Sequence, residues 1–145
     1  DPLLRDYESD YHYLFKLVAG VAGAKSDCPL VGYYAMPNIA RRLLETFLSF
    51  RFPASAAAPN GGFSALLDGV QSVDAAVKMR ILRFLHVCSH FDRVSDQEHD
   101  PSILAETPKV MGDVMALIRG EDQRHYDQMV ALVGQDAETD RVCQS

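Results

Sequence analysis

Apolar residues recur three and four positions apart along most of the chain, the spacing that places them on one face of an α-helix. In the first such stretch they are Tyr7, Tyr11, Leu14, Phe15 and Val18. This stretch predicts an amphipathic helix that begins near residue 7. We expect it to end at Gly20 or Gly23, because glycine commonly follows the last turn of a helix.

A second helix is predicted between two prolines. Pro37 suits the first turn of a helix, where its missing N–H removes no hydrogen bond, and Pro53 cannot continue one. The apolar stripe between them is formed by Ile39, Leu43, Leu44, Phe47 and Leu48. Loops are predicted on both sides of this helix, at residues 25–32 and in the small-residue stretch 54–62 (ASAAAPNGG).

The rest of the chain predicts further helices, and one polar loop at residues 92–101 separates two of them. Residues 63–70 predict a short helix, and Ser72 or Val73 opens a long one. The core positions of the long helix are Val73, Val77, Ile81, Leu82, Leu85 and Cys88. Thr107-Pro108 opens another, whose apolar positions are Val110, Met111, Val114, Leu117 and Ile118. Gly120 should close that helix, and Gly134 should close a last one over residues 121–133.

No segment alternates apolar and polar residues with a period of two, and no hairpin dipeptide separates two such runs. A chain of 145 residues is long enough for one domain with a real core. The sequence therefore predicts an all-α fold, a single bundle of five to six helices over residues 1–134. Residues 135–145 are expected to form a flexible tail.

Composition narrows the class of protein. The net charge of −6 argues against a general nucleic-acid binder, although residues 33–93 carry seven basic and four acidic groups. The three cysteines form no CxxC pair, so neither a disulfide framework nor a cysteine zinc site is indicated. No apolar run reaches the roughly 18–20 residues that span a membrane, and no signal pattern opens the chain. We therefore expect a cytoplasmic protein without membrane association.

Two stretches of the sequence match familiar ligand motifs only in part. The stretch around Gly20, Gly23 and Lys25 lacks the GxxxxGK[ST] spacing of a phosphate-binding loop, and it ends a helix instead of following a strand. His86 and His90 stand four residues apart on one predicted helix, a spacing that zinc sites use, but the sequence offers no clear third ligand. No metal and no cofactor is therefore predicted.

Charged side chains on two consecutive long helices form the best candidate site. Arg83, His86 and His90 share one face of the later helix, with Arg80 at its edge. Arg41 and Glu45 stand four residues apart on the earlier helix, with Arg42 adjacent. Taken singly, each group is explained as a solvated face or an ordinary surface ion pair. If the two helices pack together, Arg41, Glu45, Arg83 and His90 converge.

A converging set of this kind suits metal-independent RNA cleavage. Histidine or glutamate can take the proton of the ribose 2′-hydroxyl, and arginine can clamp the phosphate as its charge grows. In this hypothesis His90 is the acid or base, with His86 as second choice. Arg83 clamps the phosphate, Glu45 is the complementary base, and the substrate is bound by Arg41, Arg42 and Arg80.

The opening DPLLRDYESDYHYLF and the run MPNIARRLLETF at residues 36–47 resemble the C-terminal region of bacterial ABC-type AAA ATPases. This group includes the anticodon nucleases and related phage-defence proteins. The resemblance implies that the chain is the C-terminal part of a larger ATPase, whose upstream portion would be its partner. Anticodon nucleases are grouped with the HEPN ribonucleases, helical bundles that often dimerise, which implies RNA as substrate and a homodimer.

The residues of that group's motifs have counterparts in this chain. Arg83-x6-His90 and Arg80-x5-His86 both match the HEPN pattern of an arginine followed by a histidine, and Arg41-x3-Glu45 matches the Arg-x3-Glu pair of anticodon nucleases. Phe84 stands where a polar residue often follows the HEPN arginine. Two alternatives stay open: a non-catalytic helical domain that dimerises or packs on the ATPase, and a lobe that binds nucleic acid without cleaving it.

Overall fold

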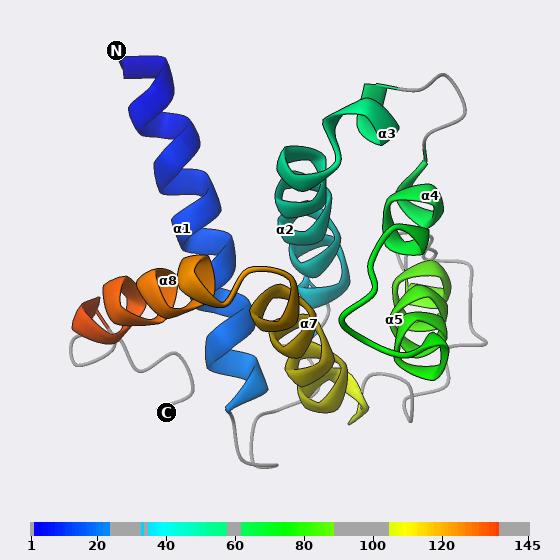
Figure 1. Cartoon of the computed structure of the whole chain (residues 1–145). Coiled ribbons are helices and arrows are strands. Elements are labelled where there is room, and N and C mark those ends of the chain that lie inside the picture. Colours follow the sequence, from blue (N-terminus) through cyan, green and yellow to red (C-terminus); the bar gives the residue numbers. More distant parts are fainter. Residues whose placement is uncertain (1, 24–32, 34, 58–61, 89–104, 137–145) are drawn as a thin grey trace, which may run out of the picture.

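The computed structural model describes residues 2–23, 33, 35–57, 62–88 and 105–136 (Figure 1). Seven helices and no strand occur in these ranges. The helices are α1 (Pro2–Ala22), α2 (Met36–Arg51), α3 (Pro53–Ala57), α4 (Phe63–Asp68), α5 (Ala75–Cys88), α7 (Thr107–Glu121) and α8 (Gln123–Asp136). The predicted all-α helical bundle is confirmed, with seven helices instead of five or six.

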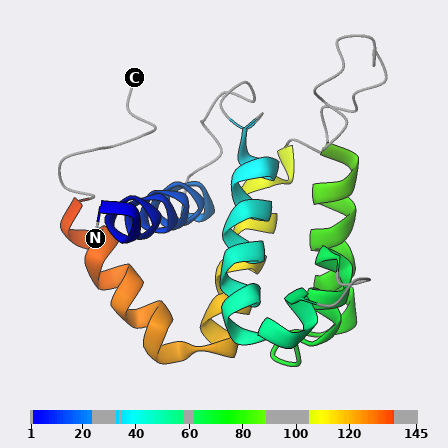
Figure 2. The same ribbon diagram turned by 90° about the horizontal axis from the view of Figure 1, so that it is seen from above.

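Three helices, α2, α5 and α7, run side by side, and α1 crosses them steeply on the other side of α7 (Figures 1 and 2). Figure 2 shows that α2 and α7 begin, and α5 ends, at the same end of this group. Helix α5 is therefore antiparallel to both α2 and α7. Beyond α7 the chain turns into α8, which packs across α1.

The core lies where α1, α2, α5 and α7 meet. Its fully buried large side chains include Phe15, Leu44, Phe84, Met111 and Ile118. Burying one such side chain contributes about 1.5–3 kcal/mol, so this shared core fixes how the helices lie against one another. Among the described residues, no helix is long and apolar enough to span a membrane.

Most predicted helices are present, and several ends differ. Helix α1 begins at Pro2, five residues before the apolar stripe that predicted it, and α2 spans the predicted interval between the prolines. The prediction of a loop at residues 54–62 is wrong in part, because Pro53 opens the short helix α3. The predicted loops at 25–32 and 92–101 lie outside the described residues.

The C-terminal glycines do not act as predicted. Helix α7 runs through Gly120 to Glu121, and α8 runs through Gly134 to Asp136, two residues past the expected end of the bundle. No described glycine has a positive φ, so none ends a helix in the left-handed conformation. The boundary between α7 and α8 is instead set by Asp122, whose carboxylate accepts a hydrogen bond from the backbone N–H of His125 at 3.0 Å.

Helix α5 also begins later than predicted, at Ala75. The carboxylate of Asp74 accepts a hydrogen bond from the backbone N–H of Val77 at 2.9 Å and caps this end of the helix. Its core face includes Phe84, which the predicted stripe omitted, together with Ile81 and Leu85. Three other residues of the predicted stripe have described side chains and are half-buried: Val73, Val77 and Leu82.

Candidate functional site

The Arg41–Glu45 pair predicted on the second helix is present on α2. Arg41 Nε donates to Glu45 Oε1 at 3.0 Å, and the two side chains are 48% and 42% exposed. This contact follows from helix geometry, because residues four apart lie on the same face of a helix. Arg42 is exposed beside them, and its carbonyl accepts a hydrogen bond from Thr46 Oγ1 at 2.8 Å. Arg41, Arg42 and Glu45 therefore lie at the surface in the middle turns of α2.

Arg80 on α5 is held against α7. Its Nε and one terminal nitrogen donate to the two carboxylate oxygens of Asp113 at 2.6 and 3.1 Å. This bidentate hydrogen bond, with the negative charge of Asp113, raises the pKa of the Arg80 guanidinium. The arrangement ties the middle of α5 to α7, so Arg80 has a structural partner.

Arg83 is held less firmly. One terminal nitrogen lies 3.7 Å from Glu106 Oε2, just before α7 begins, and its side chain is 70% exposed. A surface ion pair of this length contributes between zero and about 1 kcal/mol, so a competing anion can replace it at little cost. Of the two α5 arginines, Arg83 is thus the one open to a ligand.

A surface hollow of about 600 Å³ runs along α5 from its first turn to its last. The described residues that line it are Ala76, Met79, Arg80, Leu82, Arg83 and His86. Its polar lining is basic, and its apolar lining includes Met79, whose side chain is 65% exposed. His86 stands in the last turn of α5 and is exposed. The hollow therefore combines apolar and basic side chains on one surface.

The structure places the predicted residues in two groups. Arg41 pairs with Glu45 within α2, while Arg80 and Arg83 pair with carboxylates of α7 and the residue before it. The start of α2 and the end of α5 lie at the same end of the bundle (Figure 2). Arg41 and Glu45 stand in the middle turns of α2, and Arg80 and Arg83 stand in the middle turns of α5. His90 lies outside the described residues, so its predicted convergence with Glu45 is untested.

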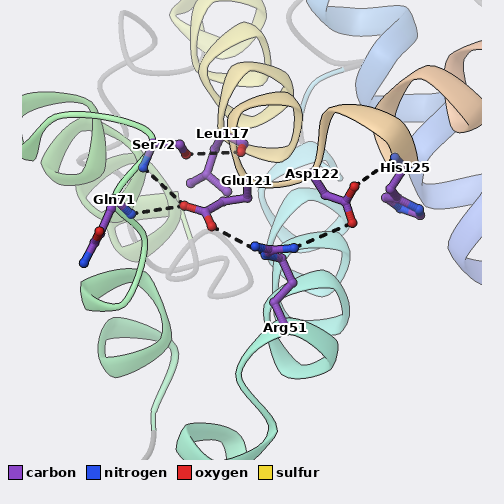
Figure 3. Close-up of polar contacts among 7 residues, drawn as sticks. All are labelled: Arg51, Gln71, Ser72, Leu117, Glu121, Asp122 and His125. Atoms are coloured by element: carbon purple, nitrogen blue, oxygen red, sulfur yellow. Dashed lines mark hydrogen bonds and ion pairs between the residues drawn. The ribbon is translucent and has the colours of Figure 1, made fainter.

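A second polar cluster, around Glu121 at the end of α7, was missed by the sequence analysis (Figure 3). Glu121 Oε1 accepts hydrogen bonds from the backbone N–H groups of Gln71 and Ser72 at 3.1 and 3.2 Å. Its other oxygen lies 3.5 Å from Arg51 Nε, and its side chain is only 10% exposed. Arg51 also lies 3.6 Å from Asp122. The partners are about 50 and 70 residues apart in sequence, so no local pattern reveals the cluster.

His125, on the first turn of α8, joins this cluster to α1 and α2. Its Nε2 lies 2.8 Å from the hydroxyl of Tyr11, and its ring stacks on Phe47 with centroids 5.7 Å apart. Burial raises the pKa of the Tyr11 hydroxyl, and the carboxylate of Asp122 adds to that shift. The neutral phenol is therefore favoured, and these contacts hold α8 against the bundle.

No group of three or more His, Cys, Asp or Glu side chains within the described ranges could hold a metal ion. No curated protein and no solved structure gives a significant match to this sequence. A protein-family model described as an AAA domain matches residues 1–116, which include every helix from α1 to α5 and most of α7. Since this match spans most of the 145 residues, the chain belongs to that AAA domain family.

Proposed function

We propose that the chain is a helical module of an AAA-type ATPase that cleaves RNA without a metal ion. The active end would be the one where α2 and α7 begin and α5 ends. The observation that supports this proposal is that α2, which carries the exposed Arg41–Glu45 pair, packs against α5, which carries Arg83 and His86. The start of α2 and the end of α5 lie at the same end of the bundle (Figure 2). The resemblance to phage-defence ATPases makes tRNA the substrate to test first.

The proposed chemistry uses one base, one acid and one clamp. The base takes the proton of a ribose 2′-hydroxyl, whose oxygen forms a bond to the adjacent phosphorus. The bond from phosphorus to the 5′-oxygen breaks, and the acid protonates that oxygen. The products are a 2′,3′-cyclic phosphate and a 5′-hydroxyl.

Within this scheme His90, or His86 as second choice, is the acid or base, and Glu45 is its complement. Arg83 would hold the phosphate, because its contact with Glu106 is long and exposed. Arg41 and Arg42 would position the neighbouring backbone. The firm contact of Arg80 with Asp113 favours a supporting role for that arginine over the substrate-binding role predicted from the sequence.

The direct test is cleavage of end-labelled tRNA by the chain, with and without a chelator. We expect cleavage in both conditions, with 2′,3′-cyclic phosphate ends. The double variant His86→Ala/His90→Ala should lose at least roughly 100-fold in rate. Arg124→Ala, an exposed arginine on α8, should stay within about two-fold of the parent chain and serves as the control. Full activity in the double histidine variant would refute the proposed roles.

The second candidate is a non-catalytic helical domain that packs on the ATPase portion or on a second copy. The observation that favours it is that Arg80 and Arg83 already have carboxylate partners on the α7 side, as cations do in a purely structural bundle. This candidate predicts no cleavage of any RNA tested. A lobe that only binds RNA predicts salt-dependent binding without cleavage. The same assay, read together with binding, separates all three functions.

A further inference from the structure

We infer that the hollow along α5 binds an unpaired nucleotide of a single-stranded RNA, with the base on Met79 and Leu82 and the phosphate on Arg83. This inference rests on the proposed function and specifies its substrate class. It gives the apolar lining of the hollow a role that the catalytic scheme does not use. It also places the bound base on the same helix as His86, which stands in the last turn of α5, at the proposed active end.

The chemistry of the lining supports this ligand. Ala76, Met79 and Leu82 supply apolar contacts, and the side chain of Met79 is 65% exposed to a ligand. A base offers a flat apolar face that can cover such residues. The hollow of about 600 Å³ is open, so a base can lie against these side chains without entering an enclosed cavity.

The charged side chains of α5 determine where the phosphate of the nucleotide binds. The helix Ala75–Cys88 carries Lys78, Arg80, Arg83 and His86 and has no carboxylate of its own. Asp113 already pairs with Arg80 through both of its oxygens, so this arginine offers little to a phosphate. Arg83 has only its long contact with Glu106, and a phosphate can replace that carboxylate. The phosphate therefore belongs at Arg83, beyond the apolar part of the hollow.

The strand must be unpaired for this contact to form. Bases within an A-form duplex stay stacked and paired, and their faces are closed to a surface hollow. A loop or a free strand can turn a base outward onto the side chains of α5. A duplex of the same length should therefore lose the apolar contact and keep only the weaker phosphate contact.

Binding can be measured separately from cleavage with a 2′-O-methyl oligouridylate of about 12 nucleotides. This probe lacks the free 2′-hydroxyl that the proposed reaction needs, so it reports binding alone. In fluorescence anisotropy, Arg83→Ala should weaken binding roughly ten-fold and reduce the salt slope by about 0.7. Met79→Ser should weaken binding roughly five-fold and leave the salt slope unchanged. Arg124→Ala and Val130→Ser remove an exposed arginine and an exposed apolar residue from α8, and should each stay within about two-fold.

Several results would overturn the inference. These are no binding of the probe, equal binding of a duplex, equal binding of an abasic strand, or a Met79→Ser variant that matches Val130→Ser. Displacement of the probe by polyglutamate at equal concentration would instead assign the hollow to an acidic protein. If the probe binds as described and tRNA is not cleaved, the nucleotide site stands and the catalytic proposal fails. Cleavage that requires Arg83 and the histidines but does not depend on Met79 would uphold the catalytic proposal and refute the nucleotide site.

Discussion

Gly120 on α7 provides the sharpest test of how the helices pack. A Cβ atom added at this position would lie 2.6 Å from Ser72 Cβ and 2.9 Å from Ser72 Oγ. Non-bonded carbon atoms prefer about 3.5–4.0 Å, so alanine at this position requires the two segments to separate. Ser72 cannot retreat easily, because its backbone N–H donates to Glu121 at 3.2 Å.

The magnitude follows from two opposing effects. Alanine in place of glycine inside a helix stabilises by up to about 1 kcal/mol, whereas overpacking costs about 1–3 kcal/mol. Gly112, on the same helix, has nothing within 4 Å of an added Cβ, so it is a matched control that shows the first effect alone. We expect Gly112→Ala to raise the free energy of unfolding and Gly120→Ala to lie about 1–3 kcal/mol below Gly112→Ala.

Urea and thermal denaturation followed by circular dichroism would measure these differences. For a domain of this size, the gap between the two variants corresponds to roughly 3–10 °C in Tm. Ser72→Gly removes the side-chain atoms that the added Cβ would meet, so the double variant Ser72→Gly/Gly120→Ala should recover most of the loss. If Gly120→Ala is as stable as Gly112→Ala, the close approach of α7 to Ser72 is wrong.

Two further predictions concern stability. Glu121→Ala should lower the free energy of unfolding by about 1–2 kcal/mol in urea titrations, because two backbone N–H groups and Arg51 lose their acceptor. The exposed Glu45→Ala should cost less than about 1 kcal/mol, and equal losses would contradict the role of Glu121 in joining the segments. The pKa of Tyr11 is raised in the folded state, so its contribution is complete below the unfolded value of 10.0 and is lost as pH rises above that value. The parent chain should therefore lose more stability above pH 10 than Tyr11→Phe does, and parallel pH profiles of Tm would refute this.

Helix positions were largely predictable because they depend on local chemistry. Apolar spacing and the two prolines located α2 almost to the residue, and the apolar stripe located α7. The starts of α5 and α8 were less predictable, because Asp74 and Asp122 cap them and neither was recognised as a cap. The Arg41–Glu45 pair was also local, since a helix brings residues four apart together whatever surrounds them.

The sequence by itself determined an all-α protein, its main helices and the charged residues worth testing. Only the tertiary structure decided which charges meet: Arg80 with Asp113, Arg83 with Glu106, and Arg51 with Glu121. It also decided that Gly120 faces Ser72 while Gly134 faces open space, although both were predicted to end helices. The physical reason is that these contacts join segments far apart in sequence. Their partners are set by the packing of the shared core, which no spacing along the chain encodes.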